Sequence, residues 1–152
     1  MSFPRLPAVL AAFLFCASIA FPQTAERELL VIETGAAQRE FQVEIADQPN
    51  ERARGLMFRR QMADTEGMLF DFGDDEPASF WMRNTYISLD MLFIEADGTI
   101  ESIAERTTPL SDKSVPSKGP VRFVLEIKGG LSDKLGIAPG DKVSGPAIDA
   151  RQ

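Results

Sequence analysis

Short runs with the residue pattern of β-strands recur along the chain, and no long amphipathic helix separates them. In the clearest run Phe41, Val43 and Ile45 alternate with Gln42 and Glu44, which places the apolar side chains on one face of a strand. Such a strand is stable only when neighbouring strands pair with it and its apolar face is covered. The pattern therefore constrains the chain to a mainly β fold.

Other segments extend this pattern. Runs of strand character occupy residues 28–33, 67–72, 77–82, 91–94, 121–127 and 142–144. Residues 73–76, GDDE, are typical of a turn between two strands. The pair Asp97-Gly98 predicts a two-residue hairpin turn with positive φ.

Helical signals are few. Asp47 and Pro49 predict the start of one short helix, and Ser132 to Leu135 predict another. Residues 107–120 are polar, contain three prolines and form the longest predicted loop. We predict a mainly β, single-domain β-sandwich or flattened barrel with two short helices.

The N-terminus has the layout of a secretory signal peptide over residues 1–20. Arg5 is followed by an apolar run from Ala8 to Ala20, and Ser18 and Ala20 are the small residues that signal peptidase prefers. We expect cleavage near Ala20 and a periplasmic or secreted protein without a membrane span. Residues 21–37 then form a lead-in with the first strand, and residues 38–148 form one β domain.

Composition excludes several kinds of chemistry. The chain has no histidine, and its single cysteine, Cys16, lies in the predicted signal peptide. The exported protein would therefore have no disulfide, no Cys/His zinc site, no Ser-His-Asp triad and no thiol nucleophile. A net charge of −7 argues against nucleic acid as a partner. We predict no cofactor.

The segment FWMRNT, residues 80–85, carries the only tryptophan and is the first candidate site. Trp81 could stack against a ligand while Arg83, Asn84 and Thr85 supply directional hydrogen bonds, with Arg54 or Arg59 at the rim. The alternative is structural: Trp81 half buried against the arginine stem, and Asn84 and Thr85 bonded to the backbone of a turn.

Asp90 and Glu126 are acids in segments that otherwise require hydrophobic residues. They could join the ligand site, or share a cleft as the acid and base of a glycosidase-type hydrolase. Alternatively, Glu126 faces solvent or pairs with an arginine.

The methionines are the only soft metal ligands outside the signal peptide. Those at positions 57, 62, 68, 82 and 91 could bind Cu(I) through their thioethers. Met57, Met68, Met82 and Met91 lie on apolar faces, however, where methionine usually fills gaps in a core. The acids of GDDE lack the spacing of a calcium loop. We predict no metal site.

Five segments resemble, in order and spacing, the domain-of-unknown-function family 192 of small prokaryotic proteins: RARGLMFR (52–59), GMLFDF (67–72), FWMRNTYISLDMLFIEADGTI (80–100), FVLEIKGG (123–130) and LGIAPGDKV (135–143). Met82-Arg83 is a mild variant of the family's usual Met-Lys. The resemblance covers nearly all of residues 38–146 and implies a single mainly-β domain of sandwich type, without an established activity.

These observations favour a binding module for a small polar ligand, glycan or peptide. The predicted site consists of Arg54, Trp81, Arg83, Asn84, Thr85, Asp90 and Glu126. The carboxylate-dependent hydrolase that uses Asp90 and Glu126 is one alternative, and a structural or partner-binding domain is another.

Overall fold

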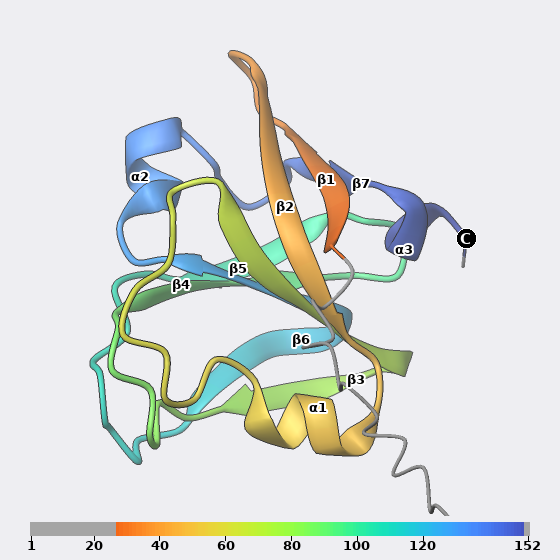
Figure 1. Cartoon of the computed structure of the whole chain (residues 1–152). Coiled ribbons are helices and arrows are strands. Elements are labelled where there is room, and N and C mark those ends of the chain that lie inside the picture. Colours follow the sequence, from red (N-terminus) through yellow and green to blue (C-terminus); the bar gives the residue numbers. More distant parts are fainter. Residues whose placement is uncertain (1–26, 151–152) are drawn as a thin grey trace, which may run out of the picture.

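The computed structural model describes residues 27–150, which form one domain built on a curled seven-stranded sheet (Figure 1). The strands are β1 (Arg27–Glu33), β2 (Gln38–Ala46), β3 (Glu66–Phe80), β4 (Leu89–Ile94), β5 (Ile100–Ala104), β6 (Val115–Lys128) and β7 (Lys142–Ser144). The helices are α1 (Pro49–Arg54), α2 (Leu131–Leu135) and α3 (Pro146–Asp149). The mainly β single domain is confirmed, with one short helix, α3, more than predicted. The predicted signal peptide lies outside the described residues.

The strand order is β5-β4-β6-β3-β2-β1-β7, and only the β2–β3 pair is parallel. The sheet curls like half a barrel (Figure 1), and an isolated bridge joins Thr99, just before β5, to Lys142 of β7. Gly98 makes this approach feasible, because a Cβ there would lie 2.4 Å from the carbonyl oxygen of Val143.

The curled sheet has hydrophobic residues on both faces. The inner core consists of residues from all seven strands and from α2 and α3, including Leu30, Phe41, Leu69, Leu92, Phe123, Leu125 and Ile148. The outer core covers the other face of β3, β4 and β6 and includes Leu56, Met62, Met68, Phe70, Met82, Met91 and Val124. The central strand β6 is therefore covered on both sides, and its side chains alternate between the two cores.

Three local predictions differ from the structure. Residues 73–76 are not a turn between two strands: β3 continues through them, with a register shift between Asp71 and Glu76. The predicted loop at 107–120 is shorter, because β6 begins at Val115. The β4–β5 hairpin is present, but its turn closes with a hydrogen bond from Gly98 N–H to Glu95 O, and only Gly98 takes positive φ.

The end of α1 prepares the candidate site. The N-cap is Gln48 rather than Asp47, and the Glu51 carboxylate accepts a hydrogen bond from the Gln48 backbone N–H. The helix ends at Gly55, where φ is +46° and a Cβ would lie 3.0 Å from the Phe70 ring. Glycine thus lets the chain pass close to β3, and Leu56 is buried in the outer core directly afterwards.

Candidate functional site

Glu126 is a buried acid on the outer-core face of β6. In the strand register it lies between Met68 of β3 and Met91 of β4, and only 4% of its surface is exposed. Among the described residues its carboxyl group makes no hydrogen bond or ion pair. Burial alone raises the pKa of Glu126 to about 8. The carboxyl group is therefore largely protonated at pH 7.

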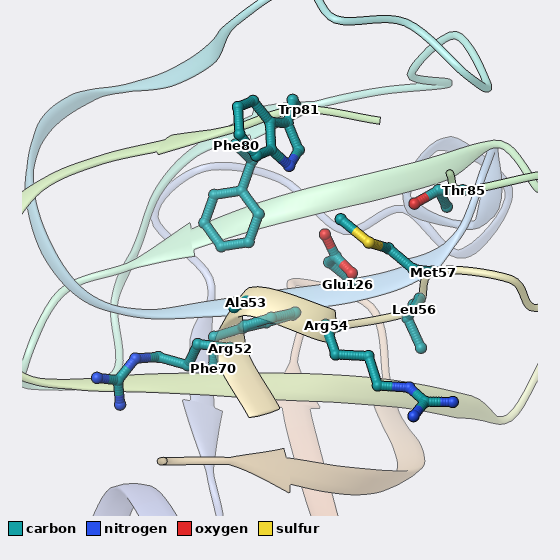
Figure 2. A pocket seen from close by; sticks show the side chains of 11 residues that line it. Arg52, Ala53, Arg54, Leu56, Met57, Phe70, Phe80, Trp81, Thr85 and Glu126 are labelled. Atoms are coloured by element: carbon teal, nitrogen blue, oxygen red, sulfur yellow. The ribbon is translucent and has the colours of Figure 1, made fainter. Parts of the chain in front are cut away.

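A small pocket opens above this carboxyl group (Figure 2). It is lined by Arg52, Ala53, Arg54, Gly55, Leu56, Met57, Phe70, Phe80, Trp81, Thr85 and Glu126. Its volume of about 40 Å³ has room for a few water molecules or a small polar group. In Figure 2 the Met57 side chain reaches towards the Glu126 carboxyl group, and Arg52 and Arg54 extend outwards on either side of α1. The lining is mostly apolar around one acid, as is common in small-molecule sites.

Four of the predicted site residues come together here: Arg54, Trp81, Thr85 and Glu126. The sequence prediction missed the residues that α1, the turn after it and β3 contribute, notably Arg52, Met57, Phe70 and Phe80. Arg52 and Met57 lie in the family-like motif at 52–59, which could have indicated them. Nothing in the sequence, however, indicates that α1 packs over β6.

Trp81 forms part of the pocket wall and remains 49% exposed. One face of its ring is not free, because the Arg83 guanidinium lies 4.3 Å from the ring centroid. Arg83 in turn donates a hydrogen bond of 2.7 Å to the Asp112 carboxylate. Arg83 therefore supports the wall and does not line the pocket.

Asn84 and Thr85 form a turn beside the pocket. Asn84 has φ of +58°, and its carbonyl accepts a 2.8 Å hydrogen bond from Phe58 N–H. Thr85 is buried, and its backbone N–H donates to Met82 O. Asn84 thus serves the local backbone, whereas Thr85 reaches the pocket lining.

Asp90 is not part of this pocket. In the register it pairs with Ile127, whereas Glu126 pairs with Met91, so the two acids project to opposite faces of the sheet. Asp90 is fully buried and accepts hydrogen bonds from Arg106 N–H, Gly130 N–H, Ser132 N–H and the Ser132 hydroxyl. The geometry gives Asp90 a structural role and leaves no shared cleft for a pair of carboxyl groups.

The methionines 62, 68, 82 and 91 are buried in the outer core, and Met57 lines the pocket. Within residues 27–150 no three His, Cys, Asp or Glu side chains gather as a metal-binding group. No helix in that part of the chain is long and apolar enough to cross a membrane.

Stability measurements on the FWMRNT segment distinguish its exposed and buried residues. We expect Trp81→Ala to lower the free energy of unfolding by only about 1 kcal/mol, because half of the side chain is already in solvent. Met82→Ala, one residue away but buried, should cost roughly 2–5 kcal/mol. Asn84→Gly should be close to neutral, because glycine tolerates positive φ. Urea denaturation tests all three, and a cost above about 3 kcal/mol for Trp81→Ala would place its ring in the core.

The comparisons with known proteins agree with the fold. The model of family DUF192, described as an uncharacterised ACR, matches residues 30–145. The chain is similar to a Sinorhizobium meliloti 1021 protein for which a role as transcription regulator has been suggested: identity is 44%, the match covers 82% of this chain and 98% of that one, and the TM-score is 0.79.

A protein of unknown function from Novosphingobium aromaticivorans DSM 12444 is also similar. Its identity is 41%, the match covers 76% of this chain and 83% of that one, and the TM-score is 0.75. No curated protein matches. The match to the family model spans most of the chain and the similar structures share its fold, so this chain belongs to the domain-of-unknown-function family 192.

Proposed function

We propose that the domain is a binding module that holds a small polar ligand in the pocket above Glu126. One observation carries the proposal: a buried carboxyl group without a partner in the described residues lies at the base of an open pocket. The pocket has room for a few water molecules above the carboxyl group. A ligand that displaces this water and reproduces its hydrogen bonds to the carboxyl group gains binding affinity.

The pocket lining indicates the chemistry of the ligand. A protonated carboxyl group donates one hydrogen bond and accepts others, which suits a hydroxyl or amide group of a sugar or a peptide. Phe80 and Trp81 offer apolar walls, and the Arg54 guanidinium at the rim has no hydrogen bond or ion pair with residues 27–150. A neutral polar group at the base and a polar or anionic group at the rim fit this arrangement.

The hydrolase alternative requires two carboxyl groups about 5–10 Å apart across one cleft. Asp90 and Glu126 lie on opposite faces of the sheet, and both oxygens of Asp90 already accept hydrogen bonds. We therefore do not propose this chemistry. The signal-like residues 1–20 support binding in the periplasm or outside the cell.

NMR titration with a panel of monosaccharides, amino acids and dipeptides tests the proposal. We expect at least one compound to shift the backbone resonances of residues 52–57, 80–85 and 126. Glu126→Leu should weaken its binding at least 10-fold, because leucine keeps the shape and removes the hydrogen bond. Thr85→Val should have a smaller effect in the same direction.

Glu40→Gln is the matched control, because Glu40 is an exposed acid on β2, away from the pocket lining. It should leave binding unchanged. Resonance shifts confined to other surfaces, or equal affinity in wild type and Glu126→Leu, would contradict the proposal.

A further inference from the structure

Three turns of the chain are joined by backbone hydrogen bonds beside the pocket, and each carries an exposed apolar side chain. Phe58 N–H donates to Asn84 O at 2.8 Å, and Leu110 N–H donates to Thr85 O at 3.1 Å, so Phe58 and Leu110 flank the same turn. The Tyr86 ring contacts the Phe58 ring edge-on, with centroids 6.4 Å apart. We call Phe58, Tyr86 and Leu110, together with Arg60, the loop patch.

The loop patch is exposed although it is apolar. Phe58 is 56% exposed and Leu110 is 58% exposed. Their side chains therefore gain little of the free energy that burial of a Phe or Leu provides. Single exposed apolar residues are common on protein surfaces, but contiguous ones mark interaction sites more often.

The backbone at the same two residues is strained. Phe58 has φ of +67° and Leu110 has φ of +61°, in the left-handed region that favours glycine. A residue with a Cβ costs roughly 1–2 kcal/mol there. Burial of these side chains within the domain does not offset that cost, because both remain exposed. Strained residues of this kind cluster at functional sites.

The charge around the patch points to the nature of the partner. The Arg60 guanidinium lies 4.9 Å from the Tyr86 ring centroid and forms no ion pair with the described residues. Arg54, also without a partner there, follows on the rim of the neighbouring pocket. These cations stand out on a chain of net charge −7. Tryptophan, tyrosine and arginine are the side chains most enriched at the energetic centres of protein interfaces.

We propose that the loop patch is a docking surface for a segment of a partner protein that combines acidic and apolar side chains. The apolar side chains would cover Phe58, Tyr86 and Leu110, and a carboxylate would pair with Arg60. This inference goes beyond ligand binding above Glu126 and does not depend on it.

A random 12-residue phage-display library, selected on the whole domain, tests the proposal. We expect enriched peptides to contain Asp or Glu together with Leu, Phe or Trp, and to bind as synthetic peptides with micromolar affinity. The double variant Phe58→Gly, Leu110→Gly should weaken binding at least 10-fold. Its melting temperature should equal or exceed that of wild type, because glycine relieves strain at positive φ. A preserved melting temperature shows that binding is lost from a folded protein.

Arg60→Gln should weaken the same peptides at least 3-fold and reduce the salt dependence of binding. Leu29→Ala is the control, because it removes an exposed apolar side chain from β1, outside the patch. Leu29→Ala should leave the affinity for the peptides and its salt dependence unchanged. Glu126→Leu should leave peptide binding intact, which separates this inference from the ligand proposal.

In the selection, two results would overturn the proposal: no peptide is enriched on wild type relative to the double variant, or the enriched peptides contain no acidic residue. Two other results would also overturn it: the domain self-associates and the double variant does not, or the domain binds vesicles of phosphatidylcholine and phosphatidylglycerol through the loop patch. The last two would identify a second copy or a membrane as the occupant. Sedimentation velocity measures self-association, and co-sedimentation with vesicles measures membrane binding.

Discussion

The free energy of unfolding should decrease as the pH rises from about 4.5 to above 8, and Glu126→Gln should remove most of this decrease. Burial raises the pKa of Glu126 from 4.5 to about 8. Below pH 4.5 the carboxyl group is protonated in both the folded and the unfolded protein. Between the two values only the unfolded protein releases the proton, so unfolding becomes steadily more favourable. Above pH 8 the folded protein also ionises, and the loss is complete.

The expected size of this effect is large for one side chain. A pKa rise from 4.5 to about 8 corresponds to at most roughly 5 kcal/mol of stability lost across that range. The depressed pKa values of Asp64, Glu66 and Asp97 affect stability at more acidic pH, because these carboxylates stabilise the fold only when ionised. Between pH 5 and 9 the change in the free energy of unfolding with pH therefore comes mainly from Glu126.

Urea denaturation of wild type, Glu126→Gln and Glu40→Gln at several pH values between 4 and 9 measures this effect. Wild type and Glu126→Gln should be similar in stability near pH 4 and differ by several kcal/mol at pH 9. Glu40→Gln makes the same chemical change at an exposed position of β2 and should follow wild type. Parallel curves for wild type and Glu126→Gln would show that the carboxyl group has a partner or ready access to water.

Asp90→Ala should destabilise the domain by roughly 3–5 kcal/mol, without any ligand present. The Asp90 carboxylate accepts three backbone N–H bonds, from Arg106, Gly130 and Ser132, and a fourth bond from the Ser132 hydroxyl. It thus fixes the segment after β5 and the start of α2 against β4. Alanine leaves these donors without an acceptor at a site from which water is largely excluded.

Asp90→Asn should fall between wild type and alanine, because an amide can accept on one side but presents an NH₂ group to donors on the other. Asp112→Ala is the control: Asp112 is an exposed acid whose ion pair with Arg83 is on the surface, so the cost should stay within about 0.5 kcal/mol. Chemical denaturation at pH 7 compares the free energies of unfolding of Asp90→Ala, Asp90→Asn and Asp112→Ala with that of wild type. A cost below about 1 kcal/mol for Asp90→Ala would mean that water replaces the carboxylate.

The sequence determined the features that depend on neighbouring residues. Alternation at residues 41–45 predicts the half-buried strand, and these residues lie within β2. Asp97-Gly98 predicts the hairpin between β4 and β5 through the turn preference of this pair; the hairpin is present with positive φ at Gly98, although its turn is not the predicted two-residue type. The five motifs predicted the family, which the family match confirms.

Only the tertiary structure decided which polar residues share a site. Asp90 and Glu126 looked equivalent in the sequence, as acids in apolar strands. Pairing of Met91 with Glu126 puts Asp90 opposite Ile127, and a shift of one residue reverses the face on which a side chain lies. Asp90 therefore became an acceptor for buried backbone donors, whereas Glu126 lies beneath a pocket and has no partner within residues 27–150. Residues of α1 and Phe80 at the end of β3 complete that pocket. These segments are distant from β6 in the sequence, so only the tertiary structure shows that they pack on the same face of that strand.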